Sequence, residues 1–510
     1  MLFTDALVLL SLLIMVFCIA RYRQHTNASK GFPLPPGPPG NIISGNIRAL
    51  AQDEAHRTFA RYRKEYGDLV MLQGLGSKIL VLNSLEAMNE LFDKRANNYS
   101  TRPNFVFAGE LMGLNQTVTM MPYGQEWRAL RKLAHTALSP AQVKKYHGME
   151  EDVAALLCTH LLESPERFSD HVRTSAGSLM IAITYGIPAS PMQTSYIIDG
   201  ERAADFFTRA IDPGRYLCDF LPFLKYAPSW VSFQRQAREG RELLFGVRGV
   251  RRRPLEQVKH EMEAGTAPPS LVHTALLSPP NDVSISQFEW RVMMVAGDIF
   301  GAGSDTTHAT LLAFIMAMAL HRDKQLKAQA EIDAIIGNSR LPIIQDRVDL
   351  PYVNALLKET MRWQPVTPTG LPRCSVDDDF YGGYYIPKNT TVLPNVWAIA
   401  YEPNEKYNPE SFLPERFLDE TQNIPDPITW AFGFGRRICP GRYLAEDIIF
   451  ILMASILAVF DIFPPDDGGI TQEFKRGLVR APNPFQCRIV PRPSADLKFV
   501  QARAEQSRTQ

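Results

Sequence analysis

The feature that most constrains this chain is the decapeptide at residues 432–441, which reads Phe-Gly-Phe-Gly-Arg-Arg-Ile-Cys-Pro-Gly. Cys439 stands between Gly435 and Gly441, and because these glycines lack Cβ atoms, backbone N–H groups can approach the sulfur closely. The apolar run at 443–460 follows and predicts a helix whose N-terminus favours a negative charge on the sulfur. The pattern therefore predicts a cysteine held as a thiolate in a rigid loop.

A thiolate of this kind suits a soft metal or a haem iron. Arg437 adds positive charge two residues from Cys439, which also favours the thiolate, and Phe432 is placed to pack on the loop and shield the sulfur. A thiolate on haem iron donates electron density and promotes O–O cleavage. The alternative is a buried free cysteine in a glycine-rich turn. The pattern Phe-x-x-Gly-x-Arg-x-Cys-x-Gly resembles the haem-ligand loop of the cytochrome P-450 family.

Composition narrows the class of protein. The chain has 510 residues, of which 45% are hydrophobic, and its 54 Lys and Arg balance its 54 Asp and Glu. A net charge near zero argues against a nucleic-acid binder. The six cysteines are scattered without paired spacing, so we expect no disulfide framework and a reducing compartment.

The N-terminus predicts a membrane anchor. Residues 6–20 carry no charge, and with their apolar flanks they approach the roughly 20 residues that span a bilayer. Arg21, Arg23 and Lys30 follow and favour a cytosolic body, whereas a cleaved signal peptide is the alternative. A proline-rich stretch comes next and predicts a stiff hinge, with a flexible linker or a partner-binding motif as the alternative. We therefore expect an anchor (1–30), a hinge (31–40), a catalytic body (41–492) and a polar C-terminal tail (493–510).

A long apolar helix is predicted at about 284–322, and its middle, at 296–307, contains three glycines. Glycines inside a helix cost about 1 kcal/mol each relative to alanine, so we expect a functional reason for them. Small residues such as Gly303 would let a flat ligand lie against the helix. Thr306 can bond back to a carbonyl and loosen the helix locally, and with Asp305 it forms an acid–alcohol pair suited to proton delivery. The alternative is a kinked core helix with a satisfied threonine.

Two further elements of the chain are similar to the same family. The segment at 302–307, Ala-Gly-Ser-Asp-Thr-Thr, matches the family's oxygen-activation motif. In the predicted helix at 351–363, Glu359 and Arg362 are three residues apart and form either a surface pair or a buried one. In the buried case Arg416, from Pro-Glu-Arg-Phe, is the third member of a triad that fixes the loop leading to the cysteine.

The resemblance also implies residues that bind the haem propionates. Trp127 and Arg131 match the family's Trp-x-x-x-Arg element, which contacts a propionate. Arg373 stands where relatives use His or Arg for the same purpose, and Arg437 is a third candidate cation. Taken singly, each arginine would read as a solvated surface charge.

The resemblance implies a mostly α-helical cytochrome P-450 fold with small β-sheets to one side, and segments 69–82 and 379–392 read as β-hairpins. It further implies haem b, O2 as co-substrate, and electrons from NADPH through a separate reductase, with cytochrome b5 as another candidate donor. Lys132, Arg128 and Arg436 are candidate reductase contacts. The expected location is the endoplasmic reticulum membrane, with a single span and a cytosolic catalytic domain.

The expected activity is monooxygenation of an apolar small molecule, because the residues we assign to the pocket are apolar. The sequence as a whole is similar to fungal secondary-metabolism members of the family, such as the O-methylsterigmatocystin oxidoreductase-like group. This similarity suggests terpenoid or polyketide hydroxylation. The alternatives are a haem-thiolate isomerase or dehydratase that needs no external electrons, and a non-catalytic membrane haem protein. The individual residues assigned to the substrate pocket are Phe206, Phe207, Phe300, Val366 and Leu478.

Overall fold

A computed structural model describes residues 28–509 of the chain, apart from 42, 43, 51, 53, 189, 190, 213, 467 and 496. The predicted anchor at 6–20 lies outside the described residues and stays a prediction. Within the described part, no helix combines the length and the hydrophobicity that crossing a bilayer would require. The five cysteines of this part are all free.

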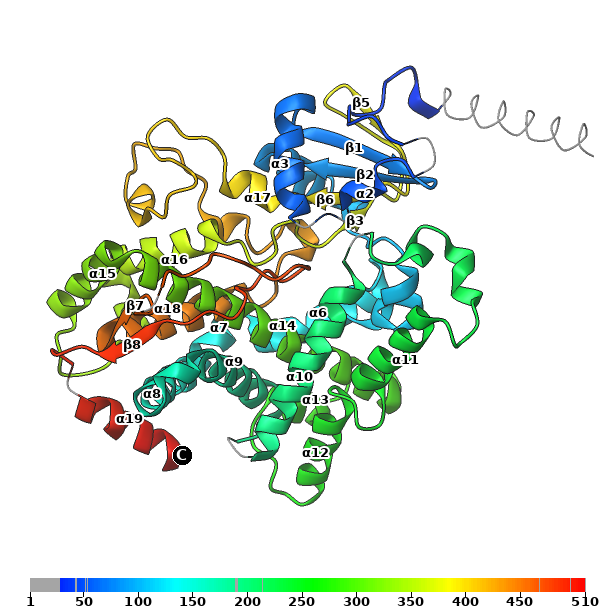
Figure 1. The fold of residues 1–510 in the computed structure, drawn as a ribbon. Helices are drawn as coiled ribbons and strands as arrows, with labels where there is room; N and C mark the ends of the chain where they lie inside the picture. Colours follow the sequence, from blue (N-terminus) through cyan, green and yellow to red (C-terminus); the bar gives the residue numbers. More distant parts are fainter. Residues whose placement is uncertain are drawn as a thin grey trace, which may run out of the picture.

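The fold is mostly helical with small sheets, as predicted (Figure 1). The helices are α2 (Ile47–Leu50), α3 (Ala55–Tyr66), α4 (Leu85–Met88), α5 (Ala96–Tyr99), α6 (Gln125–Leu138), α7 (Pro140–Val143), α8 (His147–Glu163), α9 (Phe168–Tyr185), α10 (Pro191–Ala210), α11 (Ser232–Phe245), α12 (Arg252–Glu263), α13 (Leu271–Leu277), α14 (Ile285–Leu320), α15 (Arg322–Ile335), α16 (Pro351–Trp363), α17 (Val396–Ala400), α18 (Arg442–Val459) and α19 (Leu497–Thr509). The strands are β1 (Leu69–Gly74), β2 (Ser77–Leu82), β3 (Arg373–Cys374), β4 (Asp379–Tyr381), β5 (Tyr384–Ile386), β6 (Thr391–Pro394), β7 (Phe460–Phe463) and β8 (Arg488–Pro491).

The largest sheet has the strand order β1-β2-β6-β3 and lies at one end of the molecule, with α3 and α17 beside it (Figure 1). Both predicted hairpins are present, as the antiparallel pairs β1–β2 and β4–β5. The second hairpin turns at Gly382 and Gly383, whose φ angles of 59° and 81° match the two-glycine turn that suits the twist of paired strands. The strand β6 then leaves this hairpin and pairs in parallel with β2, which joins the C-terminal half of the chain to the N-terminal sheet.

Helix α14 crosses the middle of the helical body and packs against α6, α9, α10, α16 and α18. It begins and ends within two residues of the predicted bounds, and Ser284 caps its N-terminus by accepting the N–H of Gln287 at 3.3 Å. The stretch from Thr307 to Ala319 is buried, as expected for a helix that is apolar on most of its faces. This central position lets α14 form one wall of a site while the loop before α18 forms another.

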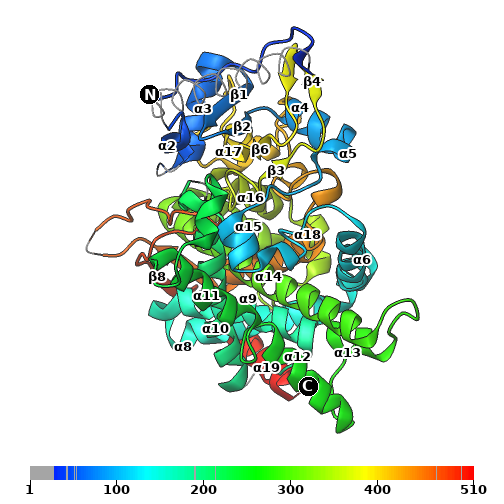
Figure 2. The same cartoon turned by 90° about the vertical axis from the view of Figure 1, so that its right-hand side faces the viewer.

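The segment that we predicted as a polar C-terminal tail, at 493–510, includes a helix. Most of it forms α19, which lies along α8 in both views (Figure 1, Figure 2). Val500 and Ala504, one helical turn apart, are buried, and Arg503 donates to Asp152 of α8 at 2.8 Å. Leu497 is partly buried against the same core. These few apolar positions make too short a pattern to stand out in a polar sequence, so the sequence did not indicate the helix.

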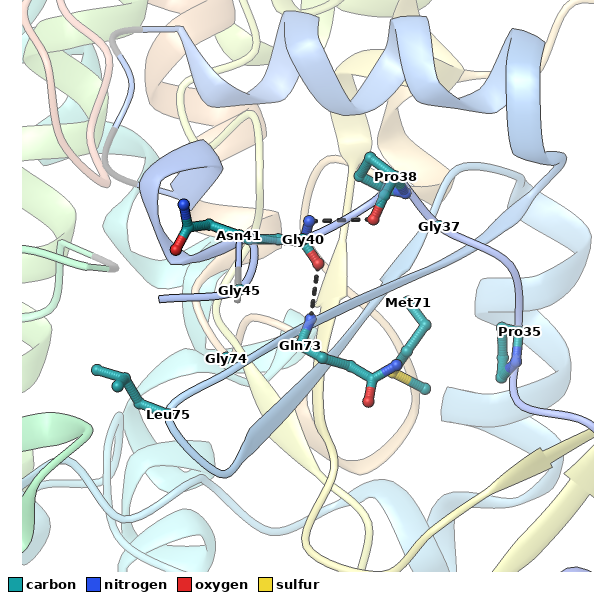
Figure 3. Close-up of a pocket in the computed structure, with 11 residues that line it drawn as sticks. Pro35, Gly37, Pro38, Gly40, Asn41, Gly45, Met71, Gln73, Gly74 and Leu75 are labelled. Carbon is teal, nitrogen blue, oxygen red and sulfur yellow. Dashed lines mark hydrogen bonds between the residues drawn. The ribbon is translucent and has the colours of Figure 1, made fainter. Parts of the chain in front are cut away.

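The proline-rich segment is extended and fixed against the sheet. The carbonyl of Pro36 accepts the N–H of Met71 in β1 at 2.8 Å, and that of Pro33 accepts the N–H of Tyr385 in β5 at 2.8 Å. A Cβ on Gly37 would lie 2.0 Å from the carbonyl oxygen of Met71, so only glycine allows this approach. A pocket of about 330 Å³ lies between the segment and β1 (Figure 3), and its lining does not include the segments around Cys439 or the middle of α14.

Candidate active site

The cysteine loop is built on close backbone contacts. The N–H of Cys439 donates to the carbonyl of Phe432 at 2.8 Å, which closes the loop just before α18 begins. Gly435 has a φ of 51°, and a Cβ on it would lie 2.1 Å from the carbonyl oxygen of Phe92. Position 435 therefore admits only glycine, as the sequence pattern indicated. Position 441 is less restricted, because a Cβ there would meet only ordinary contacts.

The surroundings of Cys439 explain its charge state. Burial raises the pKa of the Cys439 thiol, while the N–H of Gly441 and the guanidinium groups of Arg131 and Arg442 oppose that shift. Arg437, which we expected to favour the thiolate, points elsewhere. Without a further cation the protein thus leaves this sulfur as a thiol, and a metal ion at the sulfur would convert it to the thiolate.

Arginine side chains gather beside the loop without carboxylate partners. Arg102 is buried and was not anticipated from the sequence, and Arg437 is half-buried. Neither forms an ion pair with a carboxylate of the described residues. Burial lowers the pKa of Arg102 to about 10; burial and the neighbouring arginines lower that of Arg437 to about 8. Both donate to backbone carbonyls: Arg102 to Thr119, Leu371 and Pro372, and Arg437 to Ser100, Val118 and Met121.

Arg373 and Arg131 have free donors in the same cluster. Arg373 donates through Nη2 to the carbonyl of Phe434 at 2.6 Å, but its Nη1 is buried without a partner. Burial and the charge of Arg102 lower the pKa of Arg373 to about 9. Arg131 of α6 has no hydrogen bond within the described chain, and burial lowers its pKa. The indole N–H of Trp127, which we assigned to a propionate, donates instead to the carbonyl of Val118 at 3.0 Å.

These observations test whether a haem fits. Buried guanidinium groups without acidic partners are unfavourable unless an anion neutralises them. Haem brings two carboxylates and an iron that binds a thiolate, so Arg131 and Arg373 are the residues that would hold the propionates and Cys439 the one that would hold the iron. Arg437 and Trp127 hold the surrounding loop through backbone carbonyls, and Phe432 contributes its carbonyl and part of the apolar packing. The residues present fit the group.

The middle of α14 has an open face. Ala302 is exposed, and a Cβ on Gly301 would have no heavy atom within 4 Å. Thr306 donates its hydroxyl to the carbonyl of Ala302 at 2.7 Å, so the predicted bond back to the preceding turn is present. A hydroxyl is thereby fixed at the edge of open space on the helix that crosses the core.

Asp305 lies next to Thr306 but faces a different neighbourhood. Burial raises the pKa of Asp305 to about 6, an effect that the positive charges of Lys475 and Arg173 reduce and the carboxylates of Glu201 and Asp205 increase. Its carboxyl group can therefore gain and lose a proton close to neutral pH. That property is what a proton-delivering group needs.

Gly303 does not face the open side of α14. A Cβ on it would lie 2.3 Å from the sulfur of Met180 in α9. Gly297 is similarly close to Arg251, 2.6 Å from its Cγ. These two glycines allow neighbouring elements to approach the helix, and the flat-ligand role that we predicted for Gly303 has no geometric support, whereas Gly301 is the glycine beside open space.

The structure brings Glu359, Arg362 and Arg416 together as a buried triad. Arg362 donates to both carboxylate oxygens of Glu359, at 2.7 and 2.9 Å, and Arg416 Nε lies 3.0 Å from Oε2, an ion pair without good hydrogen-bond geometry. The side chains are at most 4% exposed, so the surface alternative is excluded. Leu413 adds its N–H to Glu359 at 2.6 Å. The remaining donors of Arg362 and Arg416 bind the carbonyls of Ala400, Asn408, Pro409 and Ser411.

The residues assigned to the substrate pocket fall in different places. Phe206, Phe207 and Leu478 belong to one apolar cluster with the segment at 105–120. Phe300 is buried in the main helical core, where Gly200 of α10 leaves room for its ring. Val366 is half-buried, and its carbonyl accepts the N–H of Arg480 at 2.7 Å. Three of the five assigned residues therefore share one apolar cluster, whereas Phe300 and Val366 lie elsewhere.

Comparisons with known proteins agree with this geometry. A family model described as cytochrome P450 matches residues 35–489. The chain is 38% identical over 501 residues to cytochrome P450 monooxygenase COX2 of Coprinopsis cinerea, covering 96% of this chain and 94% of the relative. It is 36% identical to cytochrome P450 monooxygenase claR of Ampulloclitocybe clavipes (92% and 88% covered) and to cytochrome P450 monooxygenase 208 of Postia placenta (96% and 95%).

Proposed function

The chain belongs to the cytochrome P450 family and is a monooxygenase, and from that premise we propose that it inserts one atom of O2 into a small apolar substrate. The observation that carries the proposal is the pairing of Cys439 and its unpartnered arginines with an intact Asp305–Thr306 pair on α14. When bound, the haem supplies the activation of O2, and the thiolate promotes O–O cleavage.

The residues of the chain have separate tasks in this proposal. Cys439 would bind the iron, while Arg131 and Arg373 would hold the two propionates. Thr306 places a hydroxyl at the open face of the helix, and its proton becomes available when the hydroxyl turns away from the carbonyl of Ala302. Asp305 supplies protons from the side of Lys475 and Arg173. A general acid with a pKa near the working pH suits such a relay.

Thr306→Ala is expected to retain haem and substrate binding but to yield several-fold less product per NADPH consumed. Without the hydroxyl, protons reach the reduced oxygen through disordered water, and hydrogen peroxide is released in place of product. The measurement compares product, peroxide and NADPH in one assay. Ser304→Ala is the control, because Ser304 makes the same bond back to a carbonyl, to Phe300 at 2.7 Å, and should stay coupled. Equal product per NADPH in Thr306→Ala and the parent would remove Thr306 from the reaction.

The proposed location is the endoplasmic reticulum membrane, with residues 6–20 as a single-pass anchor and the body in the cytosol. The uncharged stretch followed by Arg21 and Arg23 supports this. The segment before α11 also exposes large apolar side chains that can touch a bilayer. They are Phe223, Tyr226 and Trp230, which are 65%, 80% and 81% exposed.

Removal of residues 1–30 is expected to give a haem protein that leaves membranes more readily but not completely. The exposed aromatic side chains remain, so part of the protein should still sediment with vesicles at low salt. The measurement is the haem absorbance of the supernatant and the pellet after the vesicles are sedimented. Loss of the haem spectrum on truncation would contradict the separation of anchor and body, and unchanged membrane retention would contradict the anchor.

We propose that electrons come from NADPH through a separate reductase, with cytochrome b5 as a second donor. Arg128, Lys132 and Arg436 are exposed close to the cysteine loop, and Arg436 donates to the hydroxyl of Tyr123 at 3.1 Å, whose ring Arg128 also approaches. This local cluster of positive charge supports docking of an acidic partner on the cysteine side.

A direct test of the function incubates the full-length haem protein with reductase, NADPH, isotopically labelled O2 and a panel of terpenoid and polyketide probes. Incorporation of one labelled oxygen atom per product is expected. Conversion without NADPH would favour an isomerase or dehydratase. Haem binding with no conversion and no substrate-induced spectral change across the panel, even when peroxide replaces O2 and NADPH, would favour a non-catalytic haem protein.

A further inference from the structure

A group of metal-binding side chains lies outside the site described above. His147 opens α8, Glu150 follows one turn later on the same face, and Asp447 reaches them from α18, which packs on α8. One ligand atom from each residue lies within 4.8 Å of the others, and His147 Nε2 is 3.3 Å from Asp447 Oδ2. The proposed oxygen chemistry uses none of these residues.

Glu150 is the unusual member of the group. Its side chain is fully buried, and neither carboxylate oxygen has a hydrogen-bond partner in the described chain. Burial, with Asp447 and Glu151 nearby, raises the pKa of Glu150 to about 9. Buried polar groups in folded proteins are nearly always paired, because leaving one unpaired forfeits its interaction with water without a replacement. The described chain therefore provides no partner for this buried carboxyl group, and a bound ion could supply one.

The surroundings leave the other two ligands oriented and accessible. Arg347 donates to Oδ1 of Asp447 at 3.2 Å and to Glu446 at 3.4 Å, which leaves Oδ2 of Asp447 facing the imidazole. The side chains of His147 and Asp447 are 17% and 19% exposed. A surface pocket of about 530 Å³, lined in part by His147 and Arg347, opens beside the imidazole.

We propose that His147, Glu150 and Asp447 bind one divalent transition-metal ion, for which Zn²⁺ is the best match. One imidazole and two carboxylates form a donor set that suits zinc and excludes the hard cations that prefer oxygen alone. Bond lengths of 2.0–2.2 Å place tetrahedral zinc ligands about 3.3–3.6 Å apart. His147 and Asp447 are already 3.3 Å apart, and Glu150 closes the site by a side-chain movement. The ion ties α8 to α18, the helix that follows Cys439.

The test uses the purified haem-loaded protein, treated with a chelator and then titrated with ZnCl2 alone by calorimetry. One tight zinc ion per chain and a higher melting temperature are expected. Glu150→Gln and Asp447→Asn should each weaken zinc binding at least about tenfold, because they remove ligands. Glu446→Gln is the matched control, since it removes a neighbouring carboxylate that contacts only Arg347 among these residues, and should bind zinc like the parent.

Three outcomes would overturn the proposal. The first is no zinc binding by the parent, which would leave Glu150 as a protonated buried acid. The second is equal zinc binding by the parent and Glu150→Gln, which would place the ion elsewhere on the surface. The third is Mg²⁺ binding as tightly as Zn²⁺, which an imidazole-containing site does not predict. Because Glu150→Gln keeps the volume of the side chain, its melting temperature in the chelated state separates a folding defect from a loss of the ion.

Discussion

Cys439→Ser is expected to abolish monooxygenation and to remove the absorption band that marks a thiolate-bound haem in the reduced, CO-bound state. A serine hydroxyl stays protonated near neutral pH and donates far less electron density to iron than a thiolate does. The loop itself should survive, because its closure depends on the backbone N–H of residue 439 and on Gly435 rather than on the sulfur. The measurements are product formation with reductase and the reduced-CO spectrum.

Other cysteines provide the controls for this substitution. Cys374 and Cys487 also carry free thiols, but neither lies in the loop that Gly435 and Gly441 bracket before α18. Cys487→Ser should keep activity and the thiolate spectrum. Cys374→Ser should keep the spectrum with slightly weaker haem retention, because Cys374 follows Arg373 in β3. A thiolate-type band in the Cys439→Ser protein would contradict every placement that depends on this ligand.

Glu359→Gln is expected to lower the free energy of unfolding of the haem-loaded protein by about 3–5 kcal/mol. The substitution preserves volume but removes the only negative charge in contact with the buried guanidinium groups of Arg362 and Arg416 within the described residues. Loosening of the segment from Ala400 to Arg416, whose carbonyls those arginines hold, should then release haem. The melting temperature and the haem content of the purified protein report the two effects.

The control for Glu359→Gln is an ion pair with the same three-residue spacing that is exposed to solvent rather than buried. Asp170 and Arg167 form an exposed pair three residues apart, with side chains 53% and 64% exposed. Asp170→Asn should cost less than about 1 kcal/mol and leave haem content unchanged, because water screens such pairs. A Glu359→Gln protein that melts like the parent would show that the triad does not stabilise the fold.

Local patterns account for the parts of the fold that the sequence predicted well. Helix α16 begins at Pro351 and ends at Trp363 as predicted, because proline at the start and another proline soon after the end mark both boundaries within a few residues. The hairpin turn at Gly382 and Gly383 is likewise a matter of two adjacent residues. The same holds for the cysteine loop, where each restrictive residue lies within a few positions of Cys439.

Features that depend on the meeting of distant segments could not be predicted. Nothing around Arg102 in the sequence indicates that its donors reach carbonyls beyond residue 370, or that it belongs to an unpaired arginine cluster. Arg437 and Trp127 were assigned by position in a motif, but both bind the loop at 118–121. That Gly303 faces Met180 rather than open space depends on how α9 packs on α14. Likewise, residues 147 and 447 come together only because α8 packs on α18.

The measurement that most directly tests the assignment of Cys439 as the iron ligand is the reduced-CO difference spectrum of the full-length protein, with haem quantified per chain. The expected result is one haem per chain with the thiolate-type band. A stoichiometric haem whose band indicates a neutral ligand, or a folded protein that binds no haem when haem is supplied, would contradict the assignment.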